Sequence, residues 1–207
     1  MNKREMMLSL AEGNAELNTV PAAFFLHFDP AFHAGQAAID KHLEFFRATD
    51  MDFVKIQYEQ TLPPEFRIRD IADWARVPLY PDEFFEPPIK VVEGLVKAAK
   101  RDALIVMTLY SPLMWAERLM DGATVAEHLQ QNPAAVQRGL AVVTENVLRL
   151  VRGCKRAGAD GFYASTQGGE AFRFPGTDHF TRYIKPTDLA VWDELSDCAF
   201  SILHICD

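Results

Sequence analysis

The final residues of the chain, SILHICD, place two strong soft-metal ligands in one apolar run. His204 and Cys206 are two positions apart, and residues i and i+2 of a β-strand point to the same face, so both side chains could approach one ion. Imidazole with thiolate is a donor set that Zn²⁺ prefers, and catalytic zinc usually has three protein ligands and one open position. A zinc site here therefore requires a third ligand from elsewhere. The alternative is that Cys206 is a small buried apolar residue and His204 a satisfied core histidine.

Polar residues also end four earlier apolar runs. In an α/β barrel, functional residues lie at the carboxyl ends of the strands and in the loops that follow. That rule selects His27, Asp29 and His33 after the first run; Gln57, Tyr58 and Glu59 after the second; Tyr110 and Ser111 after the third; and Ser165, Thr166 and Gln167 after the fourth.

These candidates have different expected roles. Glu59 and Tyr110 are the candidate catalytic groups, although a loop carboxylate such as Glu59 is more commonly solvated. The candidates for substrate or cofactor binding are His27, Asp29, His33, Gln57, Ser165 and Gln167. Asp29-Pro30 alternatively forms only a turn. Gln167 precedes two glycines, which suit either the close approach of a ligand or a turn.

The pattern along the chain alternates strands with helices. Strands are predicted over 20–28, 52–59, 102–112, 158–166 and 200–206, and helices over 3–12, 35–50, 87–101, from Thr124, from Asn132 to about 155, and from about 187 to 195. The stretch between the second strand and the third helix, rich in proline and aromatic residues, is predicted to be a long functional loop. Each strand is continuously apolar, which indicates burial on both faces and a parallel sheet covered by helices.

The predicted fold class is α/β, a TIM-type (β/α)₈ barrel that is incomplete here. No G-x-G-x-x-G follows the first strand, which gives a dinucleotide-binding fold no support. A full barrel normally needs about 250 residues. We therefore expect residues 1–207 to form a single barrel domain, C-terminally truncated, with about five or six βα units. An open barrel exposes strand edges, so a second copy of the chain or rearranged helices are expected to cover them.

Composition and charge exclude several classes of protein. The net charge of -8 argues against a general nucleic-acid or anionic-membrane surface. The chain has no uninterrupted apolar run long enough for a membrane span, and its first residues lack the apolar region of a signal peptide. Three cysteines without a regular framework favour a reducing cytoplasm.

Two segments resemble a known family. GADGFYASTQGG, followed further on by SILHIC, is similar to the uroporphyrinogen decarboxylase superfamily, which also contains the methylcobamide:coenzyme M methyltransferases. The resemblance implies a single (β/α)₈ barrel, of which this chain would cover the first units. In the methyltransferase branch, H-x-C and a distant second Cys bind zinc. His204 and Cys206 match the first two positions, the second Cys is expected beyond residue 207, and Asp207 stands where a Gly is common.

The decarboxylase branch fits less well. It carries an Arg-rich R-Q-A-G-R segment that grips an acidic porphyrinogen, whereas the equivalent stretch here is HFDPAFH, and Gln57 and Glu59 stand where an Asp is expected. The resemblance therefore implies a zinc-dependent methyltransferase whose partners are a small thiol and a corrinoid or corrinoid protein. Zinc would lower the pKa of the thiol, and the thiolate would attack a methyl group on cobalt. The alternatives are uroporphyrinogen decarboxylase and a non-catalytic corrinoid- or tetrapyrrole-binding module.

Overall fold

The fold is built on one parallel sheet. The computed structural model describes residues 2–13, 20–57, 62–174 and 178–206. Its four strands are β1 (Val54–Ile56), β2 (Ile105–Tyr110), β3 (Gly161–Thr166) and β4 (Ile202–Ile205), and they pair in sequence order. Parallel strands in sequence order, joined by helical crossovers, are the arrangement of a TIM-type barrel. The predicted fold class, an incomplete α/β barrel, is confirmed.

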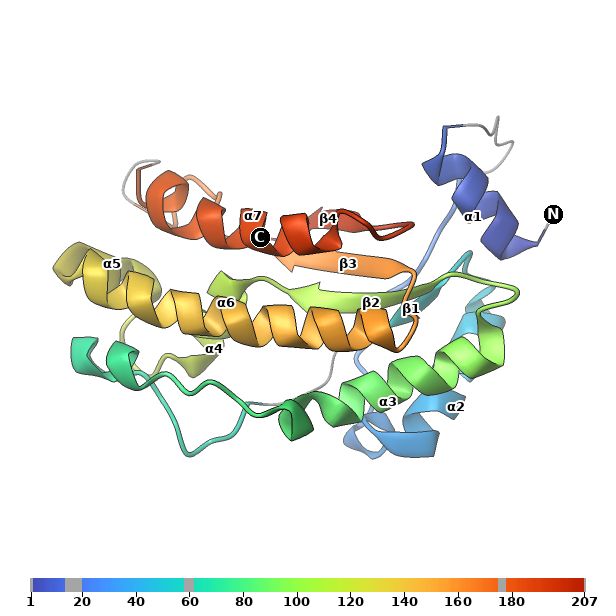
Figure 1. The fold of residues 1–207 in the computed structure, drawn as a ribbon, viewed down its shortest axis with the longest axis horizontal. Coiled ribbons are helices and arrows are strands. Elements are labelled where there is room, and N and C mark those ends of the chain that lie inside the picture. Colours follow the sequence, from blue (N-terminus) through green and yellow to red (C-terminus); the bar gives the residue numbers. More distant parts are fainter. Residues whose placement is uncertain (1, 14–19, 58–61, 175–177, 207) are drawn as a thin grey trace.

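Helices cover one face of this sheet, which we call the outer face (Figure 1). The α-helices are α1 (Lys3–Ala11), α2 (Gly35–Thr49), α3 (Asp82–Ala99), α4 (Pro112–Leu119), α5 (Val125–Gln131), α6 (Pro133–Arg156) and α7 (Lys185–Leu195). Short 3₁₀ turns η1 (Pro30–Phe32) and η2 (Ile71–Arg76) and a π-helical turn η3 (Phe180–Ile184) complete the described elements. The main apolar core lies between the outer face and helices α2, α3, α6 and α7. No helix in the described part of the chain is long and apolar enough to cross a membrane.

Local signals in the sequence predict the starts of helices α5 and α6 correctly. Thr124 and Glu127 form the predicted capping box at the start of α5, each side chain accepting from the other residue's backbone N–H. Asn132 caps α6 by accepting from the amide of Ala135, and Pro133 occupies the first turn, where its missing N–H costs nothing.

The predicted strand over residues 20–28 is wrong. The segment forms no strand, and Phe24, Phe25 and Leu26 are each about half exposed. An apolar run favours burial, but a strand also needs a partner in register. Among the described residues, this segment instead meets the chain just before β1. The amide of Asp52 donates to the carbonyl of Ala22 (2.9 Å), and the amide of Ala22 donates to the Asp52 carboxylate (2.7 Å).

Two further boundaries differ from expectation. Helix α3 begins at Asp82, so Pro87 and Pro88 lie inside it rather than in its first turn. The Asp82 carboxylate in the first turn interacts favourably with the helix dipole, and Phe85 is buried in the core. These two contributions offset the loss of the hydrogen bonds that the prolines cannot make. Strand β4 is not buried on both faces, because it is the last strand of the described sheet and its outward residues are exposed.

Helix α1 closes the amino end of the opposite, inner face (Figure 1). Met7 packs there against Phe53, Leu104 and Val106 in a second, smaller apolar cluster. The Arg4 guanidinium donates two hydrogen bonds of 2.8 Å to the buried carboxylate of Asp160, which precedes β3. The carboxyl half of the inner face is polar, and it holds the candidate site.

Candidate active site at the carboxyl ends of the strands

Three predicted site residues form a row across the inner face. Tyr110 of β2 is in register with Ser165 of β3, and Ser165 is in register with His204 of β4. Register partners in a parallel sheet point to the same side, so these side chains lie at one level on one face. The expectation that strand ends bring separate candidates together therefore holds for these three residues.

Strand β4 presents its two possible metal ligands on the inner face. Leu203 and Ile205 point outward and are 51% and 73% exposed, whereas the alternating His204 and Cys206 are half-buried. The backbone amide of Cys206 donates to the carbonyl of Thr166 (2.9 Å), which extends the pairing with β3 to this residue.

This pair supplies part of a zinc ligand set. One imidazole and one thiol on the same face suit Zn²⁺ in donor type. No group of three His, Cys, Asp or Glu residues that could hold a metal ion occurs within the described ranges of the chain. Glu59, predicted as a catalytic group, and its neighbour Tyr58 lie outside those ranges, as does Asp207.

A buried lysine lies beside this row and was missed by reasoning from strand ends. Lys55, in the middle of β1, is only 3% exposed. Its Nζ donates to the Thr108 hydroxyl (2.9 Å) and lies 4.3 Å from the centre of the Phe25 ring and 4.4 Å from that of Tyr163. The Tyr163 ring in turn stacks on His204, with centroids 5.0 Å apart. The sequence does hold a signal for Lys55, because it is a charged residue inside an apolar strand. It is two positions from Gln57, so both side chains point to the same face of the sheet.

Gln57 joins the inner face to the outer one. Its side-chain oxygen lies 3.4 Å from Lys55 Nζ, whereas its backbone amide donates to Nε2 of His42 (2.9 Å). The other ring nitrogen of His42 is 2.7 Å from the carbonyl of Ala38, so His42 donates through Nδ1 and accepts through Nε2. His42 is therefore a neutral structural link that anchors α2 to the end of β1.

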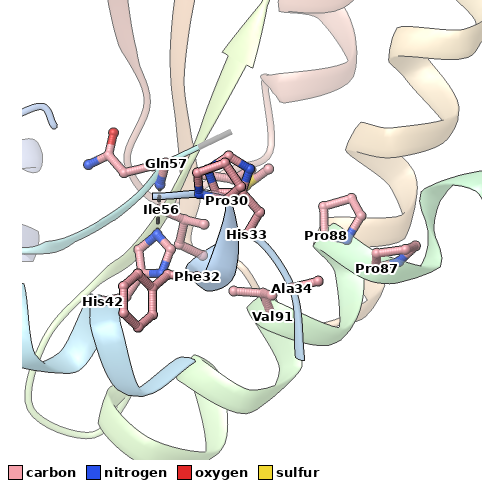
Figure 2. Close-up of a pocket in the computed structure, with 11 residues that line it drawn as sticks. Pro30, Phe32, His33, Ala34, His42, Ile56, Gln57, Pro87, Pro88 and Val91 are labelled. Carbon is pink, nitrogen blue, oxygen red and sulfur yellow. Dashed lines mark hydrogen bonds between the residues drawn. The ribbon is translucent and has the colours of Figure 1, made fainter. Parts of the chain in front are cut away.

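A cavity of about 400 Å³ lies behind Gln57, between η1 and α3 (Figure 2). Its walls are largely apolar, with Ile56 and Met107 from the outer face of the sheet and Pro87 and Pro88 from α3. Figure 2 shows the side chain of Gln57 pointing away from this cavity, so Gln57 contributes mainly its backbone. Predicted residue His33 also lines the cavity, and its Nε2 lies 2.7 Å from the carbonyl of Phe28.

The remaining candidates of the first loop are exposed. His27 packs edge-on against Phe25, with ring centroids 4.6 Å apart. Asp29 accepts from the amide of Ala31 (3.0 Å) and caps η1, which is the turn that Asp29-Pro30 was expected to form as an alternative to binding. A role of either residue in substrate binding stays a prediction.

Gln167 lies on the outer side of the sheet rather than with the inner row. It lines a cavity of about 220 Å³ with Asp188 and Trp192 of α7 and with Leu203 and Ile205 of β4. Asp188 accepts a 2.5 Å hydrogen bond from the Thr166 hydroxyl, and its second oxygen, Oδ1, is buried with no hydrogen-bond partner among the described residues.

Comparison with known proteins identifies the family. The sequence model of the family "Uroporphyrinogen decarboxylase (URO-D)" matches residues 49–207, which is most of the chain. The chain belongs to the URO-D family. Among solved structures, a methyltransferase from Methanosarcina mazei has the same fold, with a TM-score of 0.80 at 13% sequence identity; the match covers 100% of this chain and 70% of that one. A comparison with curated proteins found no significant match.

The URO-D match begins at residue 49 and so includes the whole described sheet. It also includes His204, Cys206 and the residues that surround them on the inner face. The carboxyl ends of the strands are where barrels of this type place their functional groups. Membership of the URO-D family therefore supports the inner-face row as the candidate site.

Asp188 gives this URO-D barrel a testable dependence on pH. Burial raises the pKa of its carboxyl from 3.8 to about 6, against the opposing effect of the Thr166 hydrogen bond. A carboxyl whose pKa is raised in the folded state stabilises the fold below pH 4 and loses that contribution as the pH rises through 6. At pH 8 we expect Asp188→Asn to raise the free energy of unfolding by up to about 3 kcal/mol, measured by urea unfolding. At pH 4 the free energies of unfolding of the variant and the natural chain should differ little.

The matched control is Asp193→Asn, since Asp193 lies on the same helix and is exposed. It should give no gain that appears only at pH 8. Equal gains from the two variants would show that burial of Asp188 is not the cause.

Proposed function

We propose that this chain is a zinc-dependent methyltransferase of the URO-D family, which transfers a methyl group from a corrinoid to a small thiol. The observation that carries the proposal is the half-buried pair His204 and Cys206, which faces the inner side of β4 at its carboxyl end. The fold shared with a methyltransferase is consistent with it.

The reaction class follows from the chemistry of the donors. The thiol of the substrate loses its proton, the thiolate sulfur forms a bond to the methyl carbon, and the carbon–cobalt bond breaks with its electron pair remaining on cobalt. His204 and Cys206 would hold the zinc, which when bound lowers the pKa of a coordinating thiol and so provides thiolate at neutral pH. Ser165 lies beside His204, Tyr110 lies beside Ser165, and both would contact the substrate.

We further propose that the third protein ligand is a Cys outside this sequence. With only two of the three protein ligands, the 207-residue chain alone should bind Zn²⁺ weakly and substoichiometrically. Tight binding of one Zn²⁺ per chain would contradict the requirement for a third protein ligand.

Charge favours this reaction over the decarboxylation of uroporphyrinogen. A porphyrinogen carries several carboxylates and needs a cationic clamp, whereas HFDPAFH has no arginine and the chain is acidic overall. The one buried cation that we find on the described inner face, Lys55, is covered by Phe25 and Tyr163.

The test is a direct assay of methyl transfer. A protein that contains this chain together with the proposed third ligand is incubated with Zn²⁺, methylcobalamin and a panel of small thiols. The loss of methylcobalamin is followed by absorbance, and the methyl thioether is measured by mass spectrometry. Zinc-dependent thioether formation supports the proposal. Decarboxylation of uroporphyrinogen without thioether formation would overturn it in favour of the decarboxylase, and corrinoid binding without turnover would overturn it in favour of a binding module.

A further inference from the structure

We propose that Tyr163 is a positioning residue that fixes the imidazole ring of His204, and that Lys55 holds Tyr163 in place. This inference rests on the proposed role of His204 as a metal ligand. We call the three residues the inner-face stack. In it, the Tyr163 and His204 rings are stacked with centroids 5.0 Å apart and planes 28° apart, and Lys55 Nζ lies 4.4 Å from the Tyr163 centroid.

The stack spans the sheet from β1 to β4. Lys55 comes from β1, Tyr163 from β3 and His204 from β4, so Lys55 and His204 reach Tyr163 from opposite sides of β3. Cation–π contact and ring stacking are directional attractions, and together they favour one orientation of a ring. The Tyr163 ring is therefore constrained on both sides.

Packing below and around the stack restricts it further. Tyr163 packs against the small apolar cluster at the amino end of the inner face, which includes Val106 and Ile202. Lys55 is itself held, because its Nζ donates to the Thr108 hydroxyl (2.9 Å) and lies 4.3 Å from the centre of the Phe25 ring. The stack thus connects the partly exposed end of β4 to buried, well-packed parts of the sheet.

Such support matters for a metal ligand on the last strand of the described sheet. The χ2 torsion of histidine is broad, so an unsupported imidazole samples many orientations. A metal ion accepts the nitrogen lone pair over a narrow range of directions, and residues that orient a ligating histidine typically change metal affinity by 10- to 100-fold. On β4, Leu203 and Ile205 are exposed and point away, so Tyr163 provides the ring contact for His204.

The experiment compares Tyr163→Phe, Tyr163→Leu and Lys55→Met with the natural protein, in each case in a chain that also contains the proposed third ligand, using Co²⁺ alone as the probe. Tyr163→Phe keeps the ring and should bind Co²⁺ within about twofold of the natural affinity, whereas Tyr163→Leu should bind about 10- to 100-fold more weakly. Lys55→Met should fall between them. Affinity is measured by titration of the visible absorption of Co²⁺, and circular dichroism verifies that each variant is folded.

A second measurement needs no metal. The ring protons of His204 should show an upfield ring-current shift in the NMR spectra of the natural chain and of Tyr163→Phe, and should lose it in Tyr163→Leu. A folded Tyr163→Leu with natural Co²⁺ affinity would overturn the inference. If Co²⁺ does not change the NMR signals of His204 in the natural protein, the proposed metal site fails instead. If Tyr163→Leu does not fold, the inference would be overturned by a Lys55→Met variant that has the natural Co²⁺ affinity and the same His204 signals as the natural protein.

Discussion

Cys206→Ser, made in a protein that also contains the proposed third ligand, is expected to lower the affinity for Zn²⁺ by at least about 100-fold and to abolish zinc-dependent methyl transfer. A hydroxyl is a poor zinc ligand at neutral pH because it stays protonated, whereas a thiol gives up its proton to the metal. The volume change is small, so the strand pairing through the Cys206 amide should survive. Zn²⁺ affinity is measured by competition with a chromogenic chelator, and methyl transfer by the thioether assay.

The chain contains its own control for this substitution. Cys198 is also partly buried, but it packs against the main core rather than lying on the inner face. Cys198→Ser should therefore leave Zn²⁺ affinity within about twofold of the natural value. If both substitutions weakened binding equally, the metal would be held by thiols in general and not by the end of β4.

Asp160→Ala is expected to reduce the free energy of unfolding by about 1.5–3 kcal/mol, because it removes a buried carboxylate that accepts charged hydrogen bonds. The Asp160 carboxylate accepts two hydrogen bonds from Arg4 and one from the amide of Ile105 (2.9 Å). Without it, the part-buried guanidinium of Arg4 and the buried amide of Ile105 lose this partner. Urea unfolding at pH 7, followed by circular dichroism, measures the loss.

Two comparisons isolate the cause. Asp160→Asn keeps an acceptor for Ile105 and should cost less than Asp160→Ala. Asp121→Ala removes the exposed ion pair with Arg69, whose side chain is 72% exposed, and should cost below about 1 kcal/mol. A loss from Asp160→Ala no larger than that from Asp121→Ala would mean that the Arg4 contact does not hold α1 to the sheet.

The fold was predictable where local and long-range preferences agree. Helices α5 and α6 begin at residues whose side chains cap them, so spacing alone located them. The segment 20–28 is as apolar as a strand, but strand formation depends on a neighbour that sequence periodicity does not describe. For the same reason, the exposure of β4 follows from its place at the end of the described sheet and not from its composition.

The candidate site was predictable only as far as strand ends define it. Tyr110, Ser165 and His204 lie together because parallel strands end at one edge. Gln167, two residues after Ser165, lies on the opposite side of the sheet because the loop after β3 turns outward. Lys55 and Tyr163 were missed because they lie within strands, where an apolar run conceals which residues point inward.

The contact between Arg4 and Asp160 also has a consequence for how the chain folds during its synthesis. The two residues are 156 positions apart, so α1 leaves the ribosome long before its partner exists. Until β3 is made, the apolar side of α1 that carries Met7 has only a partial surface to dock on, because the cluster it joins also includes Tyr163 and Ile202. Helix α1 thus docks well after it is synthesised, and until β3 is made it is available to chaperones.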